Sequence, residues 1–363
     1  MAKRAGLFRD LDRTLLVLIV ALCVIGLLLI SSATASQPEL QGHPLRQGVW
    51  VSLGLVLLLL VAALDYQGLV AKGYTAYITA CVMMVLLLLT AKRSHYGAAS
   101  WFNLHFFYLQ PSELCKVALI LGLAQFLTQR QGQLTRFVDY LPALGMAGFM
   151  MLLILREPDL GMALVLLPVT FTMLYVAGVK LWQLLLLGGG MAGTVPLLWP
   201  LLKEYQRNRV LTFLDPSRDS LGAGYNVIQS EIAVGSGGIF GQGYRQGTQS
   251  QLHFVPFHHT DFIFSVLGEE WGLAGELVLL ALILGLLARV AHIGGRSRSL
   301  GGALICTGLL AWLGSQTIIN IGMGLGALPV TGLPLPMVSY GGSSTMAAML
   351  GLGLVMSVHK ESQ

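Results

Sequence analysis

The sequence predicts an all-α polytopic membrane protein, and two features of its composition carry this prediction. Of the 363 residues, 55% are hydrophobic and only 11% are charged, whereas an ordinary soluble domain has about 25% charged residues. The mean hydropathy is +0.72, so lipid must solvate many apolar residues, in about ten spans of ~20 residues each. A water-soluble protein is excluded, and membrane topology explains the net charge of +5 better than nucleic acid binding does.

Ten apolar stretches along the chain fit about ten transmembrane helices. They cover approximately residues 14–35, 49–64, 71–91, 111–127, 141–155, 158–178, 181–200, 261–288, 300–323 and 339–358. The first follows a basic segment and ends near Ala33-Thr34-Ala35, as a secretory signal would. Because its apolar core exceeds the ~7–15 residues of a signal peptide, we expect a retained helix.

The loops between these stretches predict the topology. Lys and Arg are enriched on the side of both termini, which places the termini in the cytoplasm. We expect one integral membrane domain over residues 1–363, in which 201–260 is a large extracytoplasmic loop between helices 7 and 8. Within it, 225–234 has apolar residues at helical spacing and predicts a short interfacial helix. Near the end, 332–344 predicts a re-entrant or broken-helix loop.

The four cysteines do not indicate a disulfide framework or a zinc site. They lie inside apolar stretches and none has CxxC spacing, so we expect small buried side chains. His253, His258 and His259 invite a metal site, but adjacent histidines rarely bind one ion, so zinc is disfavoured. No P-loop or GxGxxG pattern is present, so we expect neither a nucleotide nor an organic cofactor.

Charged residues at membrane depth are candidates for function. Glu113 and Lys116 are three residues apart near a helix end, so they share one helix face. They are either an ion pair that holds helices together or a pair that lines a cavity, and both can be true. Asp159 follows Pro158 at the start of another span, where it either stabilises the helix terminus or directs its carboxylate into an outer cavity.

Asp261 is the leading candidate because it lies where a polar loop enters a strongly apolar helix. It could cap that helix, but Thr260 could cap equally well and leave the carboxylate free. Desolvation there would raise its pKa and make it a better general base. Arg207 and Arg209 lie in the same outer segment, where they could bind phosphate, lipid head groups or nearby aspartates.

Several motifs resemble the SEDS family (shape, elongation, division and sporulation). The resemblance spans all ten stretches and includes Tyr205-Gln206-Arg207-x-Arg209, Leu214-Asp215-Pro216, Leu221-Gly222-Ala223-Gly224-Tyr225, Ile228-Gln229-Ser230, Gly235-Ser236-Gly237-Gly238, His259-Thr260-Asp261-Phe262-Ile263-Phe264 and Ser339-Tyr340-Gly341-Gly342-Ser343. The stretch Gly247-Thr248-Gln249-Ser250-Gln251-Leu252 resembles the elongation members, the RodA type, more than the division members, the FtsW type.

The resemblance implies an inverting peptidoglycan glycosyltransferase that polymerises lipid II at the outer face of the bacterial inner membrane. The implied partner is a class B penicillin-binding protein, and undecaprenyl pyrophosphate is the leaving group. The family's motifs place the general base on Asp261 and cavity residues on Glu113, Lys116 and Asp159. Arg207 and Arg209 are expected to bind the diphosphate, on physical grounds. A divalent cation, magnesium or manganese, is expected without an identifiable ligand set.

Two other function classes remain open on the sequence. A lipid II flippase would also have intramembrane charges and broken helices, but it needs a polar path across the bilayer. A non-catalytic scaffold for the penicillin-binding protein would depend on Phe262, Ile263 and Phe264 more than on Asp261. The acidic candidates gather toward the outer face, which favours the enzyme.

Overall fold

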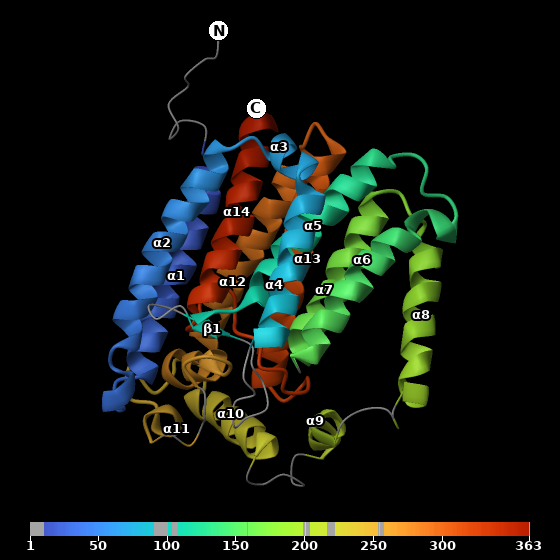
Figure 1. The fold of residues 1–363 in the computed structure, drawn as a ribbon. Helices are drawn as coiled ribbons and strands as arrows, with labels where there is room; N and C mark the ends of the chain where they lie inside the picture. Colours follow the sequence, from blue (N-terminus) through green and yellow to red (C-terminus); the bar gives the residue numbers. More distant parts are fainter. Residues whose placement is uncertain are drawn as a thin grey trace.

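The computed structural model is a bundle of long helices with short helices gathered at one end (Figure 1). It describes residues 11–90, 101–103, 108–157, 159–198, 200, 204–215, 222–252, 254 and 258–362. The long helices are α1 (Arg13–Ala33), α2 (His43–Ala63), α4 (Gly73–Thr90), α5 (Pro111–Gln129), α6 (Phe137–Arg156), α7 (Leu160–Val176), α8 (Leu181–Leu198), α12 (Ile263–Gly295), α13 (Leu300–Gly324) and α14 (Gly342–Ser362). The short elements are η1 (Pro38–Leu40), α3 (Tyr66–Ala71), α9 (Glu204–Leu214), α10 (Ala223–Gly237), α11 (Thr248–Gln251), β1 (Phe102–Asn103) and β2 (Tyr108–Leu109).

The predicted fold class is confirmed, because each long helix falls on one of the ten predicted spans. Eight of them are long and apolar enough to cross a membrane, and α7 is a shorter apolar helix of 17 residues. Two predicted boundaries differ from the observed ones by six residues or more. Helix α2 begins at His43, six residues early, because Pro44 at its first turn starts a helix whose first residues are polar. Helix α12 continues to Gly295, because its last turns carry polar residues that extend beyond the apolar span.

Helices α5 and α13 lie at the centre of the bundle. In α5, 83% of the span is buried, compared with 28% in α4 and in α6, which cover it on two sides. Close packing depends on a small residue at Gly73, where a Cβ atom would lie 2.2 Å from the Leu121 carbonyl oxygen. All four cysteines are free and buried, as predicted.

The segment between α8 and α12 lies at one end of the bundle, below the long helices in Figure 1. Its helix α10 confirms the helix predicted at 225–234, and α9 and α11 were not predicted. Ser230 on α10 donates a hydrogen bond to the Gly324 carbonyl oxygen (2.6 Å), which joins α10 to the end of α13. The segment between α8 and α12 is therefore packed onto the bundle through buried polar contacts.

The chain that follows α10 packs against a break in α12 and forms backbone hydrogen bonds with it. Gly272 has a φ of 63°, which interrupts the helix and frees backbone groups on both sides. The amides of Leu273 and Ala274 donate to the carbonyls of Gly238 and Ile239, each at 3.0 Å. A Cβ atom on Gly272 would lie 2.4 Å from the amide nitrogen of Gly241, so only glycine permits this close approach.

Residues 325–341, between α13 and α14, are irregular, and most of 331–339 is buried. This confirms irregular backbone over most of the predicted loop at 332–344, whose last three residues belong instead to α14. Buried polar side chains satisfy its backbone, as such a loop requires. Gln316 Nε2 donates to the Pro334 carbonyl at 2.7 Å. From α2, Gln47 Oε1 accepts from the amide of Gly341 at 3.1 Å. We refer to 325–341 as the α13–α14 loop.

Candidate active site

Asp261 lies directly before α12, where the segment that follows α8 ends, beside the α13–α14 loop. Phe262, not Asp261, occupies the N-cap position, and no side chain caps the helix there. Within the described residues, no hydrogen bond or ion pair reaches the Asp261 carboxylate. A Cβ atom at Gly332 would lie 3.6 Å from Asp261 Oδ2, so the loop passes directly beside the carboxylate. The capping alternative is therefore wrong, and the carboxylate is free to act on a ligand.

The backbone around Asp261 is held on both sides. Asn320 on α13 donates from Nδ2 to the carbonyl oxygens of Asp261 (2.9 Å) and Leu333 (2.7 Å). Ser339 Oγ donates to the Thr260 carbonyl at 2.6 Å, and the amide of Tyr340 donates to the His259 carbonyl at 3.1 Å. These contacts fix the position of Asp261 without using its carboxylate.

Asp159 has the first of the two roles weighed for it, stabilisation of a helix terminus. It is the N-cap residue of α7, and its Oδ1 accepts from the amide of Met162 at 2.9 Å. Its Oδ2 accepts from Gln110 Nε2 at 3.4 Å and thus stays directed toward the start of α5. Pro158, predicted to begin this helix, lies outside the described residues.

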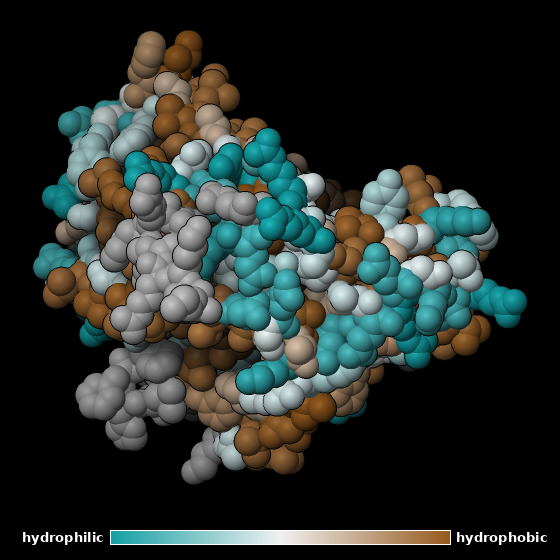
Figure 2. Space-filling view, turned by 90° about the horizontal axis from the view of Figure 1, so that it is seen from above, coloured by the Kyte–Doolittle hydropathy of each residue, from teal (hydrophilic) through white to brown (hydrophobic). Residues whose placement is uncertain are grey.

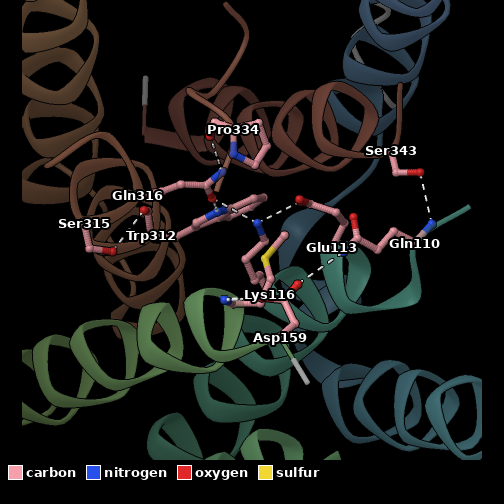
Figure 3. A network of polar contacts seen from close by, with 10 residues as sticks. Gln110, Glu113, Lys116, Asp159, Trp312, Ser315, Gln316, Pro334 and Ser343 are labelled. Carbon is pink, nitrogen blue, oxygen red and sulfur yellow. Dashed lines mark hydrogen bonds and ion pairs between the residues drawn. The ribbon is translucent and has the colours of Figure 1, made fainter. Parts of the chain in front are cut away.

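Glu113 and Lys116 form an internal ion pair (Figure 3). Lys116 Nζ lies 2.7 Å from Glu113 Oε2, and the side chains are 0% and 1% exposed. The same ammonium donates to Gln316 Oε1 at 3.0 Å and lies 4.5 Å from the ring centroid of Trp312. The pair thus joins α5 to α13 and forms the wall behind Asp159, while Glu113 Oε1 has no hydrogen-bond partner among the described groups.

Arg207 and Arg209 lie on α9 but have different surroundings. Arg207 donates a hydrogen bond from Nη2 to the Pro200 carbonyl. Arg209 lies close enough to Asp159 and Asp261 that its charge lowers the pKa of each. Arg209 also lines a small pocket with Thr212 and Pro329. The charge of Arg209 therefore acts on both aspartates.

The electrostatics of the site favour a proton acceptor. The pKa of Asp261 is raised to about 6, mainly by burial and also by the charge of Asp159, while the charge of Arg209 partly offsets this rise. Burial also raises the pKa of Asp159. A carboxyl with a pKa of about 6 is ionised at neutral pH and is still basic enough to accept a proton in a transition state.

Sequence reasoning missed two polar residues that support this arrangement, Asn320 and Gln316. Asn320 and Gln316 lie in an otherwise apolar span, which is the signal that could have found them. Glu157, at the end of α6, has two buried carboxylate oxygens with no partner among the described groups. The pKa of Glu157 is raised to about 8, mainly by burial and also by the charge of Asp159. Burial lowers the pKa of His259 to about 4, so this imidazole is neutral at physiological pH.

The predicted metal has no preformed protein site in the part of the chain that the structure describes. No group of three or more His, Cys, Asp or Glu residues there could hold an ion. His258 Nε2 donates to the Ala33 carbonyl oxygen (2.7 Å), and the His259 ring packs 5.4 Å from that of His43, measured between ring centroids. The residues present do not fit a metal centre made by protein ligands alone.

Comparison with known proteins identifies the family. The family model of cell cycle proteins that comprises FtsW, RodA and SpoVE matches residues 13–363. The chain belongs to this family. It is 38% identical over 359 residues to the peptidoglycan glycosyltransferase MrdB of Escherichia coli K12, covering 96% of this chain and 93% of MrdB. It is 33% identical to the peptidoglycan glycosyltransferase RodA of Treponema pallidum, covering 96% and 98% of the two chains.

Two solved structures are similar over almost the whole chain. One belongs to a peptidoglycan synthase complex that coordinates polymerisation and crosslinking, with a TM-score of 0.83 and 40% identity over 97% of this chain and 98% of that one. The other is RodA of Thermus thermophilus, with a TM-score of 0.72 and 33% identity over 97% of each chain. The resemblance to the SEDS family is confirmed, and the chain is an integral membrane protein.

Proposed function

We propose that this protein is a peptidoglycan glycosyltransferase that polymerises lipid II during cell elongation and cell-shape maintenance, with Asp261 as the general base. The relatives named above are peptidoglycan glycosyltransferases. The observation that carries the assignment of the base is the geometry of Asp261. Its backbone is anchored by Asn320, its carboxylate has no protein partner in the described structure, and its pKa is raised to about 6.

The chemistry joins two lipid-linked disaccharides. The 4-hydroxyl oxygen of the acceptor forms a bond to the anomeric carbon of the donor, and its proton passes to the Asp261 carboxylate. The bond between the anomeric carbon and the diphosphate oxygen breaks, and undecaprenyl pyrophosphate leaves with the bonding electron pair. Direct displacement inverts the configuration at the anomeric carbon. A positioned general base contributes about 10²–10⁴-fold to such a reaction.

The developing charge on the diphosphate requires a cation. Arg209 is the better candidate, because it lies near both aspartates and its guanidinium suits bidentate contact with phosphate oxygens. Arg207 is proposed as an auxiliary contact that would have to exchange its bond to the Pro200 carbonyl for one to phosphate. Asp159 and the Glu113–Lys116 pair shape the cavity wall, since the pair is buried and already neutralised.

A magnesium or manganese ion is proposed only as an ion that the substrate carries. Because the described residues offer no group of three protein ligands, such an ion would have to be brought by the diphosphate oxygens of the substrate. No step of the mechanism above depends on it. A chelator titration of polymerisation tests the requirement.

The partner and the location follow the same reasoning. A class B penicillin-binding protein is proposed as the crosslinking partner, since a structural relative belongs to a complex that coordinates polymerisation and crosslinking.

We place the protein in the bacterial inner membrane with both termini in the cytoplasm and Asp261 facing the periplasm. The start of α1 and the end of α14 meet at one end of the bundle, where His359 Nδ1 lies 3.7 Å from Asp12 Oδ2, which supports termini on the same side.

Two alternatives have less support. A flippase needs a polar path across the bilayer, but the middle of the central helices carries buried apolar side chains, among them Leu119, Leu123 and Leu309. A scaffold that recruits its partner through Phe262, Ile263 and Phe264 would need these side chains at the surface, and they are at most 2% exposed.

The test uses purified protein, alone and with its penicillin-binding partner, supplied with lipid II in detergent. Glycan length on a gel reports polymerisation, and labelled lipid II in proteoliposomes reports transport. Polymer from the parent that is lost in Asp261→Asn supports the enzyme. Transport of lipid II without polymer in either sample would establish the flippase instead.

A further inference from the structure

A basic pocket lies at the end of the bundle opposite to Asp261. It has a volume of about 320 Å³, and it forms where the start of α1, the end of α12 and the end of α14 meet. Three arginines, Arg13, Arg289 and Arg296, line it together with His292 and His359, whereas Asp12 is its one carboxylate. Viewed onto this end, hydrophilic side chains gather over the face and hydrophobic ones surround them (Figure 2).

The single carboxylate is already bound. Arg289 donates to Asp12 Oδ2 from Nε and from Nη2, each at 2.7 Å. Asp12 Oδ1 accepts from the amide of Leu15 at 2.9 Å and caps α1. Arg13 and Arg296 are exposed and form no ion pair with any carboxylate in the described part of the chain. Within the described residues, two guanidinium groups without an ion-pair partner therefore border the pocket.

Below the pocket, both helices present apolar side chains outward. On α1, Val17 lies one turn beyond Arg13 and is 66% exposed, and Val20 and Val24 continue the same face. On α12, Leu277 (56% exposed) and Leu284 (62% exposed) share one outward face, which Ala288 and Ala291 continue toward the pocket. The two helices pack side by side, since Leu18 is the neighbour of Gly285. A basic end that continues into paired apolar stripes matches a molecule with an anionic head and acyl chains.

We propose that this pocket binds the phosphate head group of an anionic phospholipid, whose acyl chains lie along the exposed apolar faces of α1 and α12. Basic pockets between the ends of transmembrane helices suit such head groups. A free phosphate would use the arginines alone, whereas a phospholipid also uses the apolar stripes. The site is separate from Asp261 and does not depend on the proposed glycosyltransferase activity.

The experiment measures lipid retention by the full-length protein. The purified chain in neutral detergent is supplied with phosphatidylglycerol or with phosphatidylcholine of the same acyl chains, and native mass spectrometry counts bound lipid. The variant is Arg13→Gln with Arg296→Gln. The matched control is Lys72→Gln with Lys180→Gln, which removes two exposed charges that do not line the pocket.

The parent is expected to retain phosphatidylglycerol in preference to phosphatidylcholine, a result that needs no variant. The arginine variant should bind phosphatidylglycerol about tenfold or more weakly, because each surface arginine is worth about fivefold. The lysine control should retain parental binding. Equal retention of the two lipids by the parent, or an equal loss in the lysine control, would overturn the proposal. Displacement of phosphatidylglycerol by inorganic phosphate at equal concentration would also overturn it, since the apolar stripes would then contribute nothing.

Discussion

The side-chain amide of Asn320 joins Asp261 to the α13–α14 loop, because its Nδ2 donates to the backbone carbonyls of both Asp261 and Leu333. Asn320 is completely buried at the end of α13. One side chain thus fixes the distance between the proposed base and the loop that passes beside it.

Replacing Asn320 should therefore impair turnover more than substrate binding. Asn320→Ala leaves two carbonyl groups without their donor, and an unsatisfied buried group costs about 1–3 kcal/mol. The resulting shift of Asp261 should lower kcat by about tenfold to a hundredfold, with a smaller change in the KM for lipid II. Polymerisation rates measured across lipid II concentrations check this. Asn226→Ala on α10 is the control, and equal kinetics in the two variants would contradict the positioning role.

The pH dependence of polymerisation should report the Asp261 carboxyl. Its pKa is raised to about 6, so the carboxylate is present above this pH and is lost as the pH falls through it. The rate should therefore fall on the acid side with a midpoint near 6. His259 does not explain such a midpoint, because its pKa is lowered to about 4. A rate that stays constant from neutral pH to about 5 would contradict this account.

Two substitutions should move this midpoint in opposite directions. Asp159→Asn removes a negative charge that raises the pKa of Asp261, so the acid limb should shift to lower pH. Arg209→Gln removes a positive charge that lowers this pKa, so the limb should shift to higher pH. The pH profile of kcat/KM measures both shifts. Shifts in the same direction would show that the two side chains do not act on Asp261 through their charges.

Arginine geometry should matter more at Arg209 than at Arg207. Arg209→Lys keeps the charge but loses bidentate contact with phosphate, so the lipid II requirement should rise. Arg207→Lys should have a smaller effect, because Arg207 already bonds to the Pro200 carbonyl. Steady-state kinetics with lipid II compare the two. If both variants keep the parental KM and kcat, neither arginine binds the diphosphate.

Removing only Lys116 from the buried Glu113–Lys116 pair should destabilise the protein more than removing both charges. Lys116→Met leaves Glu113 buried without its cation, which should destabilise the protein by about 3–5 kcal/mol. The double change Glu113→Gln with Lys116→Met removes both charges and should recover most of this loss. The temperature at which half of the protein leaves the monodisperse peak in size-exclusion chromatography compares the variants. A double variant less stable than Lys116→Met would show that the charges themselves stabilise the bundle.

More of the fold than of the candidate active site could be predicted from the sequence. Long apolar stretches identify spans such as 300–323 without any knowledge of their neighbours, because lipid solvation depends on composition alone. Asp261, Asp159 and Arg209 could be nominated singly, because each charge lies at an unusual place in the sequence. Their juxtaposition could not be predicted, since it depends on how α7, α9 and α12 pack. Similarly, Asn320 is one polar residue in an apolar span until the structure places it against Asp261.

The central claim is that the Asp261 carboxylate accepts the proton of the attacking hydroxyl. The most direct measurement is lipid II polymerisation by Asp261→Asn, a variant of nearly the same shape that has no basic carboxylate. The account predicts a rate at least about a hundredfold below the parent, with the protein still monodisperse and still bound to its penicillin-binding partner. Glycan strands made at the parental rate by Asp261→Asn would contradict it.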